Sequence, residues 1–233
     1  MRKSFFYGMA LVLTGLFFSC TSKPDVKLPP PTPKPIEEPI PKPVEEPIPK
    51  PIEEPVIPSA PESILGRGLV TQKVLASFLL ENNAGVKPDY ARELSGYYIR
   101  EAAVEGVNHD VAFVQMCLET GYLRFGNLVT PDMNNFCGLG AIDAAHPGEK
   151  FPNMQTGVRA HIQHLKGYAT EAPLKQDLVD PRYRWVQKGS APTIRGLTGK
   201  WAADPGYDVK IRGILVRLYD FAAMQGAGWA TDG

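Results

Sequence analysis

VAFVQMCLETGYLRFGNLVTPDMNNFCGLG, residues 111–140, is the stretch that decides the fold. Its first eight residues are apolar except Gln115, and the run ends in Glu119, the only acidic residue between positions 111 and 124. A loop rich in Gly, Asn and aromatic residues follows at once. A carboxyl group at the C-terminal end of an apolar helix has a raised pKa, because the helix dipole and the apolar neighbours both disfavour its charge. We therefore expect Glu119 to serve as a general acid at the lip of a groove. The alternative is a solvated surface residue.

The overall charge of the chain is balanced. Its 233 residues include 25 Lys and Arg and 25 Asp and Glu, so the formal net charge is zero. Proteins that bind nucleic acid usually carry a basic excess, so we expect no nucleic acid partner. A balanced charge fits a neutral or weakly charged ligand such as a glycan. We expect a monomer without a cofactor.

The N-terminus resembles a bacterial lipoprotein signal. Arg2 and Lys3 are followed by an apolar run over residues 5–18 and then by Ser19 and Cys20. The run is too short for a comfortable membrane span. On this resemblance, cleavage leaves Cys20 as a lipidated first residue, and the exported chain is anchored to a bacterial membrane, facing the periplasm or the cell surface. An ordinary secretory signal or an N-terminal anchor is the alternative.

Residues 21–62 form a linker rich in Pro, Glu and Lys. It contains three copies of one octapeptide, PKPIEEPI at 33–40, PKPVEEPI at 41–48 and PKPIEEPV at 49–56. Proline at every second or third place blocks helix and predicts polyproline II, which rises about 3.1 Å per residue. We expect a disordered, semi-rigid spacer. A PxxP ligand for a binding domain is the alternative.

A single globular domain is expected over residues 63–233, after the signal at 1–20 and the linker. Apolar periodicity, caps and breakers predict helices at about 70–82, 88–106, 108–120, 156–169 and 204–224. The stretch 125–153 has many Gly, Pro and Asn and predicts a small β-lobe or hairpin. The predicted fold class is mainly α, formally α+β.

Four blocks, in order, resemble the glucosaminidase domain of glycoside hydrolase family 73, which includes bacterial autolysins and the flagellar muramidase domain. The blocks are LETGYLRFG, NNFCGLGA, FPNMQTGVRAHIQHLKGYA and GKWAADPGYDVKI. The resemblance covers about residues 111–218. It implies a lysozyme-like fold and an endo-β-N-acetylglucosaminidase that cleaves the N-acetylglucosaminyl β-1,4 bond in the glycan strands of peptidoglycan.

The family motifs carry over to particular residues of this chain. The family's catalytic acid lies in an E-[ST]-G block, which places it on Glu119. Its N-x-F-G-[IL] block maps onto residues 135–139, which would line the groove, and its Y-A-[TA]-D-P-x-Y block maps onto residues 201–207. Trp201 stands where tyrosine is common, so the aromatic ring is kept and the hydroxyl is lost. Cys137 stands where Phe or Ala is frequent.

Sugars place two demands on a binding groove. Their apolar ring faces stack on aromatic side chains, while their hydroxyl and amide groups bond to Asn and Gln. Gln115 is four residues from Glu119 and shares its helix face. We expect Phe125 and Phe136 to pack in the core. The predicted substrate-binding residues are Gln115, Tyr122, Asn134, Asn135, Trp201 and Tyr207.

A second carboxylate would define the stereochemical course of hydrolysis. We favour Glu149 as the second catalytic residue, followed by Asp143, with Asp132 as a further candidate. A separation from Glu119 of about 5 Å would indicate a retaining enzyme, and about 6.5–9.5 Å an inverting one. Substrate assistance by the N-acetyl group needs no second carboxylate. The alternative is that all three candidates are ordinary loop residues.

The cysteines and histidines allow other interpretations. Cys117 and Cys137 flank Glu119, and we favour two buried free thiols over a disulfide because nothing fixes their geometry. His161 and His164 lack a third ligand of matching pattern, so we expect structural roles and no metal. A Cys–His peptidase is disfavoured, since neither cysteine has a nucleophile signature.

Two further functions are compatible with the same groove. The first is a lytic transglycosylase on the same fold, which would leave an anhydro-muramic product. The second is a peptidoglycan-binding lipoprotein without turnover, motivated by the departures at Trp201 and Cys137.

Overall fold

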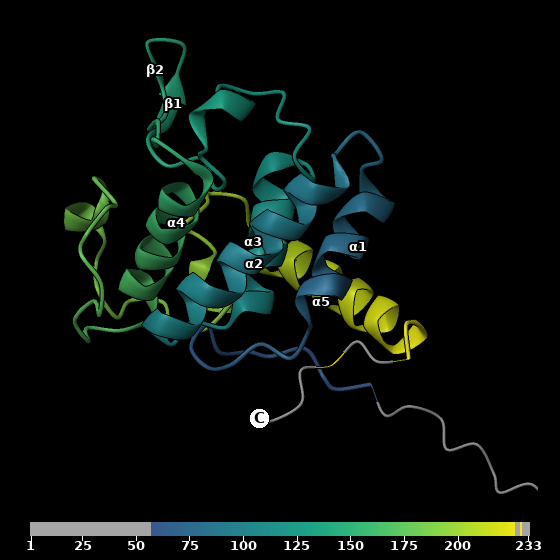
Figure 1. Ribbon diagram of the computed structural model, residues 1–233. Helices are drawn as coiled ribbons and strands as arrows, with labels where there is room; N and C mark the ends of the chain where they lie inside the picture. Colours follow the sequence, from purple (N-terminus) through teal and green to yellow (C-terminus); the bar gives the residue numbers. More distant parts are fainter. Residues whose placement is uncertain (1–56, 227–228, 230–233) are drawn as a thin grey trace, which may run out of the picture. The chain divides into compact units, whose positions relative to one another are not determined.

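The computed structural model describes residues 57–226 and residue 229. The signal segment, Cys20 and the octapeptide repeats lie outside these residues. The described part is mainly helical with one small two-stranded sheet, as the sequence predicts (Figure 1). None of its helices is long and apolar enough to cross a membrane. The α-helices are α1 (Gln72–Asn82), α2 (Pro88–Glu105), α3 (His109–Thr120), α4 (Met154–Ala169) and α5 (Tyr207–Met224).

The predicted helix positions agree with these bounds to within about three residues at each end. Of the predicted β-lobe or hairpin, the structure has a hairpin of β1 (Ala141–Asp143) and β2 (His146–Pro147), which pair antiparallel. The rest of the stretch 125–153 is loop with one short 3-10 turn, η1 (Pro131–Met133). Two further 3-10 turns, η2 (Tyr183–Trp185) and η3 (Arg195–Leu197), interrupt the connection between α4 and α5.

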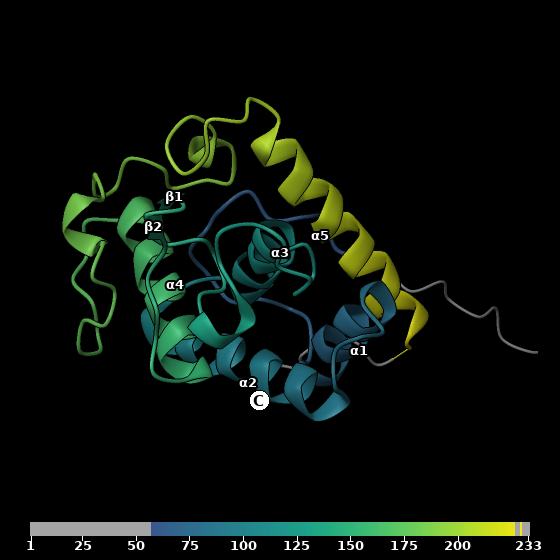
Figure 2. The ribbon, with the colours of Figure 1, turned by 90° about the horizontal axis from the view of Figure 1, so that it is seen from above.

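Helix α3 lies in the middle of the other four helices, as the view from above shows (Figure 2). Seven of its successive residues, from 111 to 117, are completely buried. A helix that is apolar on every side needs such a central place, which explains the unbroken hydrophobic run. Asn108 caps its start by accepting the N–H groups of Asp110 and Val111 at 3.0 and 3.3 Å. Gly121 ends it in a left-handed conformation.

A buried carboxylate on α2 holds the connection that follows α4. Glu105 accepts the ammonium group of Lys166 at 2.7 Å, and it also accepts the backbone N–H groups of Lys175 and Gln176 at 3.0 and 3.1 Å. The charge is thus paired and its oxygen atoms are satisfied, as a buried ion requires. The contacts tie the segment after α4 to two helices of the core.

Gly157 is expected to be intolerant of any side chain. It lies in the first turn of α4, and a Cβ there would stand 1.8 Å from the carbonyl oxygen of Asn134. The methyl group of alanine would force the loop that contains Asn134 to move. Overpacking of this kind costs about 1–3 kcal/mol, so we expect Gly157→Ala to lower the free energy of unfolding by roughly 2 kcal/mol in a urea titration.

Gly213 provides the matched control. It lies in α5, and a Cβ there would meet no atom within 4 Å. Alanine has the better helix propensity, so we expect Gly213→Ala to stabilise the protein by about 0.5–1 kcal/mol. A Gly157→Ala variant as stable as Gly213→Ala would contradict the close approach of position 157 to the carbonyl oxygen of Asn134.

Candidate active site

A cleft of about 550 Å³ opens beside the C-terminal end of α3. Its walls come from the end of α3 with the loop after it, from the loop that leads to β1, and from residues 201–202. Among the described residues that line it, Glu119 is the only carboxylate. Arg124 is the only cation on these walls within the same set. The cleft therefore presents one acidic group to a ligand with little other charge around it.

Glu119 is largely buried and held by two donors. The indole N–H of Trp201 donates to its Oε1 at 3.0 Å, and the hydroxyl of Tyr207 donates to the same oxygen. Burial raises the pKa of Glu119, and the hydrogen bonds from Tyr207 and Trp201 partly offset this. The net direction is the one that the sequence predicts. Among the described residues, Oε2 has no hydrogen-bond partner, so this oxygen is the one able to carry a transferable proton.

A chain of buried polar groups continues behind Tyr207. Gln115 donates from Nε2 to the Tyr207 hydroxyl at 2.9 Å, and its Oε1 lies 3.0 Å from Nε2 of His161. Nδ1 of His161 lies 2.9 Å from the hydroxyl of Tyr98. Because Oε1 of Gln115 can only accept, Nε2 of His161 carries the proton and Nδ1 accepts from Tyr98. The donors then point along one series of hydrogen bonds, from Tyr98 through His161, Gln115 and Tyr207 to Glu119.

His161 is neutral in this arrangement. Its side chain is fully buried, and burial, with a smaller contribution from the charge of His164, lowers its pKa to about 3. His164 lies nearer the surface and pairs with Asp180, with 2.7 Å between Nδ1 and Oδ2. Both histidines are structural, as expected. No spacing in the sequence connects His161 or Tyr98 to Glu119, so neither contact could be predicted from it.

Gln115 does not lie at the groove surface. The sequence places it on the face of Glu119, but its side chain is 0% exposed and its amide is occupied by Tyr207 and His161. The predicted direct contact with substrate is therefore replaced by a supporting position behind the cleft. The reason is that α5 and α4 cover this face of α3.

Tyr122 also departs from its predicted position. It does not line the cleft; its ring packs against Phe78, with 6.2 Å between the ring centroids, and its hydroxyl accepts from Arg217 at 3.1 Å. The backbone after α3 explains the difference, because Tyr122, Leu123 and Phe125 all have positive φ angles of 51–62°. Such conformations are costly for non-glycine residues and turn the chain away from its helical direction.

Asn134 and Asn135 shape the loop and do not bind through free amides. Asn134 donates to the carbonyl of Phe151 at 3.1 Å. Asn135 is completely buried and donates to the carbonyls of Leu139 and Glu149 at 2.9 and 3.0 Å. Its Oδ1 accepts the N–H of Leu139 at 3.0 Å. The predicted amide contacts with sugar are thus replaced by bonds within the loop, although Asn135, Cys137 and Gly138 of this block do line the cleft, as predicted for residues 135–139.

None of the three predicted second carboxylates lines the cleft. The side chain of Glu149 is 32% exposed and lies 3.8 Å from Nη1 of Arg182. Asp132 pairs with Lys150 at 2.7 Å, and Asp143 accepts the N–H groups of the hairpin turn. Asp132 and Glu149 lie in loops and Asp143 ends strand β1, all outside the cleft, which agrees with the alternative of ordinary loop and turn residues and not with a catalytic role for Glu149.

The remaining predictions concern sulfur and metal. Cys117 and Cys137 are both free and buried, as favoured from the sequence. Burial raises the pKa of both thiols. Within the described ranges, no group of His, Cys, Asp or Glu is arranged to hold a metal ion.

Fold and site together give a helical domain whose cleft carries one largely buried carboxyl group that accepts from two aromatic donors. Residues 95–220 match the glucosaminidase family, described as mannosyl-glycoprotein endo-beta-N-acetylglucosaminidase. This region is more than half of the chain, and the chain belongs to that family of glycoside hydrolases. It is also 42% identical over 158 residues to an uncharacterized protein of Borreliella burgdorferi, covering 68% of this chain and 78% of the relative. No solved structure matches it.

Proposed function

We propose that the protein is an endo-β-N-acetylglucosaminidase that cleaves the β-1,4 bonds of peptidoglycan strands with Glu119 as its general acid. One observation carries the proposal: Glu119 is the only carboxylate among the described residues of the cleft, and burial raises its pKa. A protonated carboxyl at neutral pH is what departure of a sugar oxygen requires. The family match supports the reaction class.

In this mechanism, Glu119 gives the proton on Oε2 to the glycosidic oxygen while the bond from that oxygen to C1 breaks. The charge left on the carboxylate is stabilised by Trp201 and Tyr207, which both donate to Oε1. Hydrogen bonds to an ionised acceptor are stronger than those to a neutral one, so both bonds strengthen as the proton leaves. Trp201 thus supplies a donor to Glu119 although it lacks the tyrosine hydroxyl.

The substrate's own N-acetyl group best fits the role of nucleophile. No second carboxylate lines the cleft within the described part of the chain. The acetamido oxygen bonds to C1 as the leaving oxygen departs, forming an oxazolinium ring. Water then attacks C1, opens the ring and gives its proton to the carboxylate of Glu119. The product keeps its anomeric configuration, and the acid is restored.

Product analysis tests the reaction. Purified peptidoglycan digested by the full chain should release fragments that end in reducing N-acetylglucosamine, which mass spectrometry after borohydride reduction identifies. Anhydro-muramic ends would instead show a lytic transglycosylase. Binding of peptidoglycan without release of any new end would show a wall-binding protein without turnover.

We also propose that the domain works at a bacterial membrane surface, anchored through Cys20. The signal-like N-terminus and the Pro-rich repeats support this, and both lie outside the described residues. Labelled palmitate should enter the wild type and not a Cys20→Ser variant; equal labelling of both would refute the anchor.

A further inference from the structure

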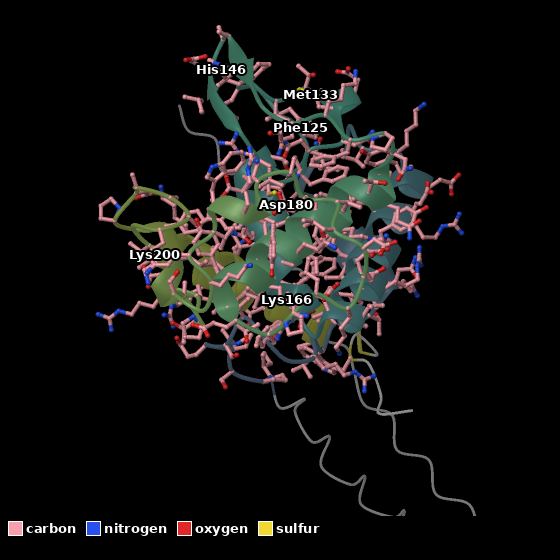
Figure 3. The ribbon with its side chains drawn as sticks, turned by 90° about the vertical axis from the view of Figure 1, so that its left-hand side faces the viewer. Phe125, Met133, His146, Lys166, Asp180 and Lys200 are labelled. Carbon is pink, nitrogen blue, oxygen red and sulfur yellow. The ribbon has the colours of Figure 1, made fainter. Side chains whose placement is uncertain are left out.

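A second cavity, of about 250 Å³, adjoins the cleft across Trp201. Cys137, Gly138 and Trp201 line both spaces, so the two lie side by side. The far wall of this cavity comes from η2 and the residues beside it, on the side of the molecule that faces the viewer in Figure 3. Its position makes it a neighbouring subsite for an extended chain bound beside Glu119.

The far wall carries an exposed indole with two guanidinium groups. Trp185 is 58% exposed, which is unusual for so large an apolar side chain. The guanidinium carbon of Arg182 lies 4.4 Å from the centroid of its ring, and that of Arg184 lies 4.0 Å away. Cation–π contacts hold both guanidinium groups in place before a ligand arrives, which reduces the entropy lost on binding.

The charge of this wall is only partly balanced by nearby acids. The sequence PRYRWVQK, residues 181–188, has three cations and no acid. Asp180, labelled near the centre of Figure 3, is occupied by His164 at 2.7 Å. Glu149 forms a long ion pair with Arg182, with 3.8 Å between its Oε1 and Nη1 of the guanidinium group. No carboxylate lines the second cavity among the described residues. Arg182 lines the cavity, and among the described residues its guanidinium group makes no hydrogen bond and only the long ion pair with Glu149, so its donors remain available for an anion.

The wall is also held rigidly. Gln163 on α4 accepts the N–H groups of Val179 and Asp180 at 2.9 and 3.3 Å. Asp180 in turn accepts the N–H of Arg182 at 2.8 Å, and the ring of Tyr183 packs closely over Gly167. Positioned donors on a fixed support are the arrangement that a specific subsite requires.

We propose that this cavity binds a carboxylate on the lactyl-peptide substituent of a muramic acid residue, with Arg182 as the specificity residue and Trp185 beside it. The inference rests on the proposed function. Every second sugar of a peptidoglycan strand carries such a substituent, whereas a chain of N-acetylglucosamine alone has no anion. A guanidinium binds carboxylate with two parallel hydrogen bonds, and the indole offers an apolar surface to the adjoining sugar or methyl group.

Equilibrium binding tests the subsite without turnover. The full chain carrying Glu119→Gln is titrated with peptidoglycan strands bearing stem peptides, with the same strands after amidase removal of the peptides, and with neutral N-acetylglucosamine oligomers of equal length. Adding Arg182→Gln should raise the Kd for one or both acidic strands about 10-fold or more, because a charge-assisted bond is lost, and leave the Kd for the neutral oligomer unchanged. The pair of acidic strands shows whether the carboxylate belongs to the lactyl group or to the peptide.

Two further variants keep the test decisive. Arg184→Gln changes an exposed side chain and should have a smaller effect in the same direction, which preserves the comparison if Arg182→Gln folds poorly. Arg92→Gln, at an exposed pair with Asp89 on α2, is the matched control and should change no Kd. Equal loss on acidic and neutral strands, or no loss on either, would overturn the subsite. Since no cleavage is needed, an inactive wild type would count against the proposed function alone.

Discussion

Replacing Glu119 by glutamine is expected to lower the rate of peptidoglycan cleavage about 10²–10⁴-fold, the usual contribution of a general acid. Glutamine keeps the size and can still accept from Trp201 and Tyr207 through its oxygen, but it has no proton to transfer. Release of reducing ends measured at neutral pH checks the result. Glu93→Gln, on the exposed side of α2, is the matched control and should keep full activity.

The same variant should be more stable than the wild type in neutral and alkaline solution. Burial raises the pKa of Glu119 in the folded state above its unfolded value. Below the unfolded value both states are protonated, and the residue has no effect on stability. As the pH rises through the folded pKa, the ionised form destabilises the fold, so Glu119→Gln gains in Tm there and not in acid. Activity lost together with a lower Tm would indicate structural damage instead.

Replacing Tyr207 by phenylalanine is expected to lower kcat roughly 10–100-fold, as loss of one hydrogen bond to a charged group would. The hydroxyl of Tyr207 lowers the pKa of Glu119, so its removal raises that pKa further. The active form of the acid is protonated and disappears as the pH rises through this pKa. The alkaline fall in the rate should therefore move to higher pH.

A second tyrosine gives the control for this change. Tyr97 donates to Glu93 at 3.1 Å on the surface of α2, so Tyr97→Phe removes a similar pair far from the cleft. It should leave both kcat and the pH profile unchanged. An alkaline limb that stays in place, or moves to lower pH, in Tyr207→Phe would contradict the role given to its hydroxyl.

Local patterns were enough to predict the helical framework. The apolar run of α3 predicts that helix from neighbouring residues alone, and the structure starts it after Asn108 and ends it at Gly121. Glu119 could be chosen for the same reason, because it is the only acid near the end of that run. Tyr207 and Trp201 were predicted through family blocks as substrate-binding residues. The structure brings both to Glu119, but only Trp201 also lines the cleft.

The predicted side-chain positions that the structure corrects depend mostly on contacts between elements far apart in the sequence. Helical spacing puts Gln115 on the face of Glu119, but it does not reveal that Tyr207, 92 residues later, covers that face. The partners of His161 lie 46 and 63 residues away, so no spacing rule connects them. Tyr122 was misplaced because three non-glycine residues after α3 take left-handed conformations, which their identities do not predict. Glu149 was favoured only for its place in a loop, and that loop turns it towards Arg182.

The ionisation of Glu119 itself is the most direct test of the central claim. Carboxyl ¹³C NMR of the labelled protein, with the Glu119→Gln variant to assign the signal, follows this titration without reference to any substrate. We predict that the resonance titrates above the ordinary range for glutamate and that its midpoint coincides with the alkaline limb of kcat/KM. A midpoint at or below the ordinary value would contradict the account, because the cleft would then hold an ionised group with no proton to give.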